Sequence, residues 1–279
     1  MRKRRIRAVI LDIDGVVYIE DRLLPSVAST IHALRRRGIR VLFATNNASL
    51  TRTGFARKLS RLGIPCAPNE LMNAALAAAD WLRRRMPRGS RIQVFGNRGL
   101  ATELRAAGLT PVWCHTRAGF RAIRARNPGI RSVCVAFDTS LTHWDLCAAH
   151  LALQRGASFV ACNLDSTWPV KGHLLPGTGS LVRLLQEASG QEPILIGKPS
   201  PELFRRALAP HRIAPRDAIV VGDRLDIDVA GGKALGTRTA LVLTGVDTRA
   251  DIRRHGIRPD AVLRTLSDLL RLPGIAGSA

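Results

Sequence analysis

Short apolar runs that end in polar residues recur along this chain, and they constrain its fold more than any other feature. The run Ala8–Leu11 is followed by Asp-Ile-Asp-Gly, and the run at 40–44 is followed by Thr-Asn-Asn. Between them, residues 25–37 carry apolar side chains at helical spacing, and Gly38 ends that segment. A strand, a helix and a strand joined by short connections predict a parallel α/β unit.

The same pattern returns late in the chain. The continuous apolar run Ala218–Val221 ends in Gly-Asp, and two further runs follow at 239–243 and Ala261–Leu263. Open α/β sheets carry their binding sites at the carboxyl ends of their strands, where these polar residues would lie. The sequence therefore predicts an α/β fold with a Rossmann-like parallel sheet.

The middle of the chain has strands and helices of its own. It contains apolar runs at Arg91–Phe95, 132–137 and Ser158–Ala161, each near a helical segment. This stretch is long enough for a domain inserted within the first one. We place the first part of the core domain at 1–77, the inserted domain at 78–177 and the second part of the core at 178–279.

The composition fits a globular protein with an unusual charge. Of 279 residues, 46% are hydrophobic, which is enough to bury a core, and 43 Lys and Arg outnumber 21 Asp and Glu to give a formal charge of +22. Such a balance raises the alternative of nucleic-acid binding. The arginine clusters, however, lie beside helix-like segments and lack interleaved aromatic residues for base stacking. We therefore favour solvated, arginine-rich helix faces that reflect a compositional bias.

Cysteine usage and the N-terminal sequence bear on location. The five cysteines are odd in number and include no Cys-x-x-Cys pair, so we expect reduced thiols in a cytoplasmic protein. The basic, apolar start resembles a signal peptide, but Asp12 and Asp14 interrupt its apolar run and no cleavage site follows. No apolar stretch reaches the length of a membrane span.

Two segments with candidate chemistry follow the early strands. Asp12 and Asp14 point the same way if the backbone stays extended, and two carboxylates this close need a cation between them. An acidic turn that merely closes a strand is the alternative. Thr45, Asn46 and Asn47 offer a hydroxyl and backbone N–H groups that can hold a phosphate, although this segment taken alone is better interpreted as an ordinary polar turn.

Two further segments lie in the last third of the chain. Lys198, in Gly-Lys-Pro, follows a short apolar run in a chain that has only five lysines. Taken alone, this segment is better interpreted as a solvent-exposed lysine. Asp223, Asp226 and Asp228 follow the run Ala218–Val221, where carboxylates can bind a hard cation such as Mg²⁺. A helix N-cap accounts for one of these aspartates but not for all three.

In this order, the four segments resemble the motifs of the haloacid dehalogenase-like (HAD) superfamily, namely DxD, Thr or Ser, Lys, and GDxxxxD. The closer resemblance is to its NagD-like subclass, the para-nitrophenyl phosphatase group (IIA) with a large α/β cap. It rests on the stretches LDIDGVVY, ATNNAS, PGTGSL, IGKPSPELF and VGDRLDIDVAGG, and it covers essentially the whole chain. The resemblance implies a HAD core at 1–77 and 178–279 with an inserted α/β cap domain at 78–177.

The resemblance also implies catalytic roles. Asp12 would attack phosphorus to form an aspartyl-phosphate, and Asp14 would be the general acid and then the general base. Thr45 and the N–H groups of Asn46 and Asn47 would hold the phosphoryl oxygens. Lys198 would neutralise the charge of Asp12 and of the phosphoryl group.

A magnesium site and a cap segment follow from the same resemblance. Asp223 would bind Mg²⁺ directly, together with the side chain of Asp12 and the backbone carbonyl of Asp14, and Asp228 would support the metal shell. In the cap, Cys162-Asn163-Leu164-Asp165 resembles the family's T-N-x-D segment, with Cys where Thr is common. Asn163 and Asp165 are therefore candidates for contacting the substrate.

The sequence thus predicts a cytoplasmic, Mg²⁺-dependent phosphomonoester hydrolase that acts on a small phosphorylated metabolite. Asp14 argues against a dehalogenase, because a departing halide needs no proton. Two alternatives remain: a phosphotransferase on the same scaffold, and a basic, nucleic-acid-associated HAD-like binding protein. We expect a small phosphate ester as the partner, no membrane and no specific nucleic acid, and we leave homo-oligomer formation open.

Overall fold

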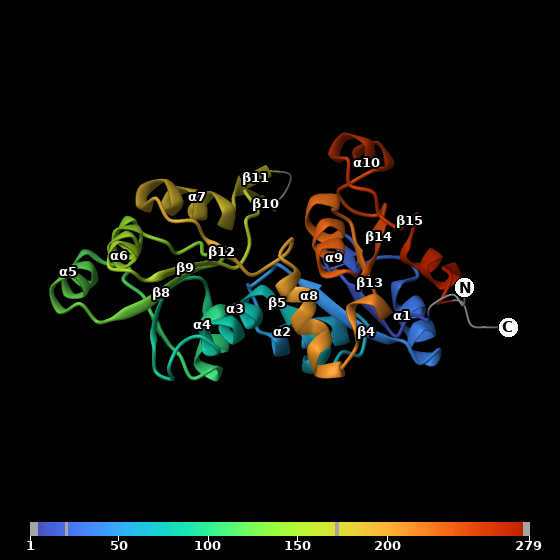
Figure 1. Ribbon diagram of the computed structural model, residues 1–279, viewed down its shortest axis with the longest axis horizontal. Coiled ribbons are helices and arrows are strands. Elements are labelled where there is room, and N and C mark those ends of the chain that lie inside the picture. Colours follow the sequence, from blue (N-terminus) through green and yellow to red (C-terminus); the bar gives the residue numbers. More distant parts are fainter. Residues whose placement is uncertain (1–4, 20–21, 171–172, 276–279) are drawn as a thin grey trace. The chain divides into compact units, whose positions relative to one another are not determined.

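The computed structural model describes residues 5–19, 22–170 and 173–275, and its chain divides into two compact units (Figure 1). Unit 1 comprises Met1–Thr45, Arg52–Met72 and Lys198–Ala279. Unit 2 comprises Asn46–Thr51 and Asn73–Gly197. The predicted cap range 78–177 lies within unit 2, which also takes in residues 46–51, 73–77 and 178–197. Where a cap domain begins and ends stays a prediction.

Unit 1 is built on a sheet with the strand order β15-β14-β13-β1-β4-β5. The two central neighbours of β1 pair with it in parallel, with Leu11 opposite both Val221 and Phe43. The strands are β1 (Ala8–Leu11), β4 (Arg40–Thr45), β5 (Leu71–Asn73), β13 (Ala218–Gly222), β14 (Arg238–Val242) and β15 (Ala261–Leu263). A short antiparallel pair, β2 (Tyr18–Ile19) and β3 (Arg22–Leu23), follows β1.

The helices of unit 1 bury apolar stripes against the core. In α1, Val27, Ile31 and Leu34 are fully buried at the spacing of one helix face, as the sequence predicts. They pack in one cluster with β1, β4 and β13 side chains such as Val9 and Phe43. The helices are α1 (Val27–Arg36), α2 (Arg52–Arg61), α8 (Pro201–Leu208), α9 (Ala230–Leu235) and α10 (Arg249–His255).

Unit 2 has its own parallel sheet, with the order β12-β9-β8-β6-β7. Its core includes Phe95, Val133 and Phe159 from three neighbouring strands. The strands are β6 (Arg91–Phe95), β7 (Thr110–Val112), β8 (Ile130–Val135), β9 (Ser158–Ala161) and β12 (Ile194–Leu195), with an antiparallel pair β10 (Thr167–Val170) and β11 (His173–Pro176). The helices are α3 (Ala74–Arg83), α4 (Arg98–Ala106), α5 (Arg117–Arg126), α6 (His143–Gln154) and α7 (Thr178–Ser189).

The strand order places the polar strand ends of unit 1 at one edge of its sheet. Because β1, β4 and β13 run parallel, Asp12, Thr45 and Asp223 all lie at their carboxyl ends. All five cysteines, which are within the described residues, are free thiols. Among the described residues, none of the helices combines the length and the apolar character that a membrane span needs.

The core of unit 1 provides a matched test of burial. Ile10 in β1 is completely buried, whereas 48% of Ile19 in β2 is exposed. We expect Ile10→Ala to lower the free energy of unfolding by about 2–5 kcal/mol, because it removes buried methylenes and leaves a cavity. Ile19→Ala makes the same change at the surface and should stay within about 0.5 kcal/mol of the parent. Urea unfolding curves of both variants measure the difference, and equal losses would contradict this packing.

Candidate active site

The candidate site lies at the carboxyl ends of the central strands of unit 1. The backbone N–H of Asp12 donates to the carbonyl of Val221 at 2.9 Å, which extends the pairing of β1 with β13 by one residue. Asp223 directly follows β13, and Thr45 is the last residue of β4. All three side chains are buried, with at most 8% of any of these residues exposed. The sheet therefore holds these polar groups rigidly, away from bulk water.

Lys198 links two of the buried carboxylates. Its Nζ donates to Asp12 Oδ1 at 2.6 Å and to Asp228 Oδ1 at 2.7 Å. The Lys198 and Asp228 side chains are 3% and 1% exposed, so both ion pairs are desolvated. A buried ammonium is costly unless it is paired in this way. The lysine that stands alone in Gly-Lys-Pro is thus a buried residue of the cluster and not a solvent-exposed one.

Asp228 reaches Lys198 because the backbone after Asp223 widens into a π-helical turn, Leu225–Val229. The backbone N–H of Asp228 donates to the carbonyl of Arg224 at 2.9 Å, and Asp228 Oδ2 accepts the Arg224 N–H at 3.2 Å. A Cβ atom at Gly222 would collide with the Asp228 side chain. π-Turns of this kind occur often at functional sites.

Asp223 is held by a loop that the sequence analysis did not single out. Its Oδ2 accepts the N–H of Val246 at 2.9 Å, and its carbonyl accepts the N–H of Asp247 at 3.0 Å. A Cβ atom at Gly15 or at Gly245 would clash with the Asp223 side chain. In the sequence, this loop is marked only by Thr244-Gly245, shortly after β14, and that pair resembles many other turns.

The residues present fit a divalent cation. Asp12, Asp223 and Asp228 each offer a carboxylate oxygen, and these three oxygens lie within 4.8 Å of one another. Three buried carboxylates face one buried lysine, so the cluster carries an excess of negative charge. An all-oxygen donor set of this kind suits a hard cation.

The pKa shifts agree with this excess charge. Burial raises the pKa of Asp12 well above its usual range, and the neighbouring Asp228 and Asp223 raise it further against the opposing effect of Lys198. Burial and Asp228 raise the pKa of Asp223 to about 6. Burial alone would lower the pKa of Lys198, but Asp12 and Asp228 raise it above its usual value, so the lysine stays charged. The raised pKa values of Asp12 and Asp223 thus have the same physical cause, which is burial of several like charges close together.

Asp14 differs from these residues because it is exposed. Loss of hydration around its carboxyl raises its pKa, whereas Lys198 and Lys58 act in the opposite direction. Lys58 comes from α2, and its Nζ lies 4.2 Å from the centre of the Tyr18 ring. Gly15 makes the turn after Asp14 with a φ of +79°, a backbone conformation that favours glycine.

The remaining predicted residues fall in unit 2. Asn163 Nδ2 donates to the carbonyl of Asn46 at 3.2 Å, and both residues are buried. Asn163 Oδ1 accepts the N–H of Asp165 at 3.2 Å, and Asn47 Oδ1 accepts the N–H of Ser49 at 2.9 Å. The structure thus joins Asp12, Lys198, Asp223 and Asp228 in unit 1, and Asn46 with Asn163 and Asp165 in unit 2.

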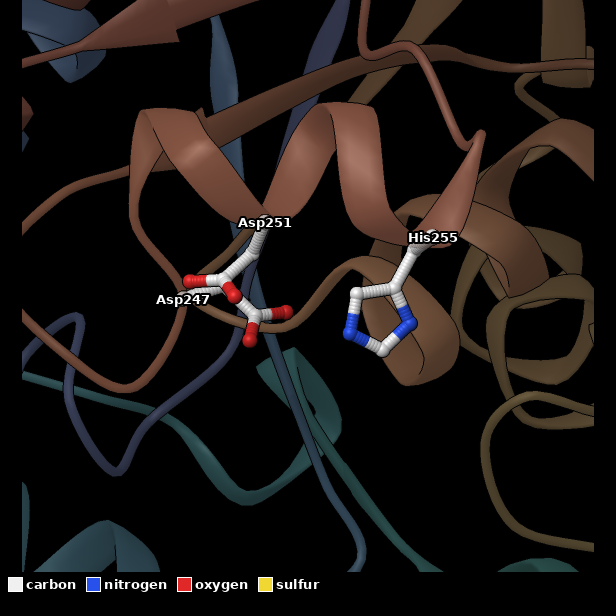
Figure 2. A group of neighbouring side chains, drawn as sticks. All are labelled: Asp247, Asp251 and His255. Atoms are coloured by element: carbon white, nitrogen blue, oxygen red, sulfur yellow. The ribbon is translucent and has the colours of Figure 1, made fainter.

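A second group with metal-ligating atoms lies on the loop after β14 and on α10. Figure 2 shows Asp247 and Asp251 side by side, with His255 at the end of the helix. Asp247 Oδ2 accepts the N–H of Leu225 at 2.7 Å, and Asp251 Oδ2 accepts the N–H and the hydroxyl of Thr248. These contacts close the loop beside Asp223 and cap α10, so the group is accounted for by local structure.

Comparisons with known proteins agree with this geometry. Residues 9–110 match the family described as haloacid dehalogenase-like hydrolase, and residues 195–269 match the family described as HAD-hydrolase-like. The chain is 34% identical to the glycerol-3-phosphate phosphatase of Gallus gallus, over 95% of this chain and 91% of that protein.

Solved structures give the same result. A glycerol phosphate phosphatase from Mycobacterium tuberculosis in complex with magnesium superposes with a TM-score of 0.84 at 32% identity, covering 96% of this chain and 78% of that one. NagD from E. coli K-12 superposes with a TM-score of 0.83 at 28% identity, covering 95% of this chain and 98% of that one.

The chain therefore belongs to the haloacid dehalogenase-like hydrolase family. Within it, the likeness to NagD and to the phosphatases confirms the predicted NagD-like subclass, the predicted fold class and the prediction of a phosphatase.

The ion pairs of Lys198 lead to a stability prediction. Lys198→Met keeps the length of the side chain but leaves the buried carboxylates without their cation, so we expect a loss of about 3–5 kcal/mol near pH 7. Without the lysine, the pKa of Asp12 rises further above its unfolded value. The destabilisation is therefore fully present above that pKa and shrinks as the pH falls and Asp12 takes up a proton.

Lys233→Met is the matched control, because Lys233 is exposed on α9 in the same unit. Urea unfolding of both variants at pH 7.5 and near pH 5 measures the effect. A Lys198→Met loss that equals the Lys233→Met loss, or that grows towards low pH, would contradict the ion pairs.

Proposed function

We propose that this protein is a Mg²⁺-dependent phosphomonoester hydrolase that acts on small phosphorylated metabolites through an aspartyl-phosphate intermediate. The observation that carries the proposal is the buried contact of Asp12 with Lys198 at 2.6 Å, beside Asp223 and Asp228. A carboxylate that is fixed by a cation in a dry site is a competent nucleophile for phosphorus.

Asp12, Asp223 and Asp228 are the side chains that would hold the magnesium ion, and Asp14 would contribute its backbone carbonyl. The bound ion would neutralise charge on the phosphoryl oxygens. Lys198 would add a second positive charge on the side of Asp12 Oδ1. Phosphoryl transfer depends mainly on such positioning and charge neutralisation, and the buried cluster provides both.

The residues of the chain would carry out two steps. In the first, an oxygen of Asp12 forms a bond to phosphorus while the bond to the leaving oxygen breaks, and Asp14 donates its proton to that oxygen. In the second, Asp14 removes a proton from water, which attacks phosphorus and breaks its bond to Asp12. Phosphate leaves and both carboxyl groups return to their starting states. The raised pKa and the exposure of Asp14 suit a group that must exchange protons with solvent.

We assign the remaining predicted residues to substrate contacts. Thr45 and the N–H groups of Asn46 and Asn47 would hold the phosphoryl oxygens. Asn163 and Asp165, in the segment that would belong to a cap domain, would contact the organic part of the substrate. Because the relatives of Gallus gallus and M. tuberculosis are named for glycerol phosphate, we propose a small polyol phosphate as the first substrate to test.

The nucleophile gives a direct test. Asp12→Asn should abolish phosphate release from glycerol 3-phosphate and from para-nitrophenyl phosphate while the protein stays folded, because it removes the attacking oxygen. The matched control is Asp226→Asn, in the segment between Asp223 and Asp228, because the Asp226 side chain is 44% exposed and pairs with Arg224. Asp226→Asn should keep its turnover within a few-fold of the parent.

Mass spectrometry of the quenched enzyme provides a second readout for the same pair of variants. A phosphorylated peptide that contains residue 12 should be trapped in the parent and in Asp226→Asn, but not in Asp12→Asn. Substantial turnover by Asp12→Asn would overturn the mechanism, whereas transfer of phosphate to an added alcohol instead of water would favour the phosphotransferase.

Metal binding should depend on pH in a stated direction. Chelation should abolish turnover, and Mg²⁺ should raise the melting temperature at pH 7.5. This rise should fade below about pH 6, because Asp223, with a pKa of about 6, then binds a proton that the cation must displace. Asp223→Asn should lose the Mg²⁺-dependent rise, whereas Asp226→Asn should keep it. Turnover that persists in chelator would contradict the site.

A further inference from the structure

A basic cavity lies at the edge of unit 1 opposite the candidate active site. It encloses about 540 Å³ and is lined by Arg5, Arg7, Gly38, Arg40, His211, Ile213 and Asp217. Arg7 directly precedes β1, Arg40 is the first residue of β4 and Asp217 directly precedes β13. These are the amino ends of the same strands whose carboxyl ends carry Asp12, Thr45 and Asp223.

The basic cavity and the candidate active site lie at opposite ends of the strands and are well separated. Arg7 and Asp12 are five residues apart along an extended strand, which corresponds to about 16 Å at roughly 3.3 Å per residue. A ligand in the cavity would therefore not overlap with a phosphate ester bound at Asp12. The size of the cavity falls within the range of small-molecule sites, about 300–1,000 Å³.

Among the residues that line the cavity, positive charges outnumber negative ones. Three guanidinium groups line it against one carboxylate, that of Asp217. Among the residues that the structure describes, neither Arg7 nor Arg40 forms an ion pair with a carboxylate. Exposed arginines on the helices differ, because Arg83, Arg205 and Arg254 each pair with an acid three residues away in sequence.

Backbone hydrogen bonds fix Arg7, Arg40 and Asp217 at neighbouring positions of the sheet. The N–H of Arg40 donates to the carbonyl of Arg7 at 2.9 Å, and the N–H of Arg7 donates to the carbonyl of Asp217 at 2.8 Å. Like charges on adjacent strands repel, and the repulsion costs stability unless an opposite charge intervenes. Gly38, with a φ of +71°, leaves space in the lining, since an added Cβ would have only Arg5 Nη2 nearby, at 3.8 Å.

We propose that this cavity is a second anion site, built for a small, multiply charged phosphate compound and separate from the candidate active site. Arg7 and Arg40 would bind its phosphoryl oxygens, because guanidinium groups match the geometry of phosphate. Arg5, whose Nη2 also donates to the carbonyl of Arg37 at 3.4 Å, would close one side. A concave pocket of this size favours a small polyphosphate over the extended backbone of a nucleic acid.

His211 reports on the occupancy of the cavity. Burial and the neighbouring Arg40 lower its pKa, whereas the backbone of Asn69 and the carboxylate of Glu70 act in the opposite direction. Arg5, Arg7 and Asp217 share the cavity with it. A bound anion would stabilise the imidazolium and so raise the pKa of His211.

The test uses pyrophosphate as the probe, in chelator, on the full chain with isotope-labelled histidines. His211→Asn identifies the His211 signal in the NMR spectrum. Pyrophosphate should raise the pKa of His211 in a saturable manner. The double variant Arg7→Gln/Arg40→Gln should weaken this binding by at least about tenfold, since it removes two charged hydrogen-bond donors from the phosphoryl oxygens.

Arg216→Gln is the control, because Arg216 is exposed and lies one residue from Asp217 but outside the cavity lining. It makes the same Arg-to-Gln change once, where the double variant makes it twice. It should bind pyrophosphate like the parent, and turnover of para-nitrophenyl phosphate should be unchanged in both the double variant and Arg216→Gln. An equal loss of pyrophosphate binding in Arg216→Gln, or a His211 signal that does not change when pyrophosphate is added, would overturn the proposal. Tighter binding of a short DNA duplex than of pyrophosphate at His211 would also overturn it, in favour of a nucleic-acid surface.

Discussion

The pairing of one buried lysine with two buried carboxylates organises unit 1. Lys198 arrives from the start of the last third of the chain, Asp12 from the first strand and Asp228 from the π-turn after β13. None of these charges is stable in a dry environment unless the others are present. The residues at 15, 222 and 245 are glycines, and a Cβ atom at any of them would clash with the side chain of Asp223 or Asp228. The backbone around the site is therefore packed closely against the charged side chains that form it.

Much of the fold follows from local patterns in the sequence. The strands Ala8–Leu11, Arg91–Phe95, Ser158–Ala161 and Ala261–Leu263 have the predicted bounds, because each is a short apolar segment between clear end signals. Other elements shift by one or two residues at their ends. The strand predicted at 132–137 runs instead from Ile130 to Val135, since its first residues continue the pairing with β6 and Phe137 lies beyond the ladder.

The site itself was only partly accessible from the sequence. Carboxylates that directly follow parallel strands are predicted to lie together at one edge of the sheet. The order of the four motifs along the chain identifies the family. No pattern predicts that Val246 would hold Asp223, or that Tyr18 would place Lys58 near Asp14, because these contacts join segments far apart in the chain through single backbone or ring atoms. The basic cavity could not be predicted either, since nothing in the sequence distinguishes its three arginines from the other 35 in the chain.

The order of segments along the chain has a consequence for how the protein is made. Unit 1 takes its strands from both ends of the sequence, and β1 pairs with both β4 and β13, which lies more than 200 residues after it. The strands β6 to β9 of unit 2 follow one another without interruption by unit 1. During synthesis, unit 2 can therefore acquire its sheet while β1 and β4 still await their partner. Asp12 and Lys198 meet only after the ribosome has passed residue 198, so an incomplete chain has no assembled active site.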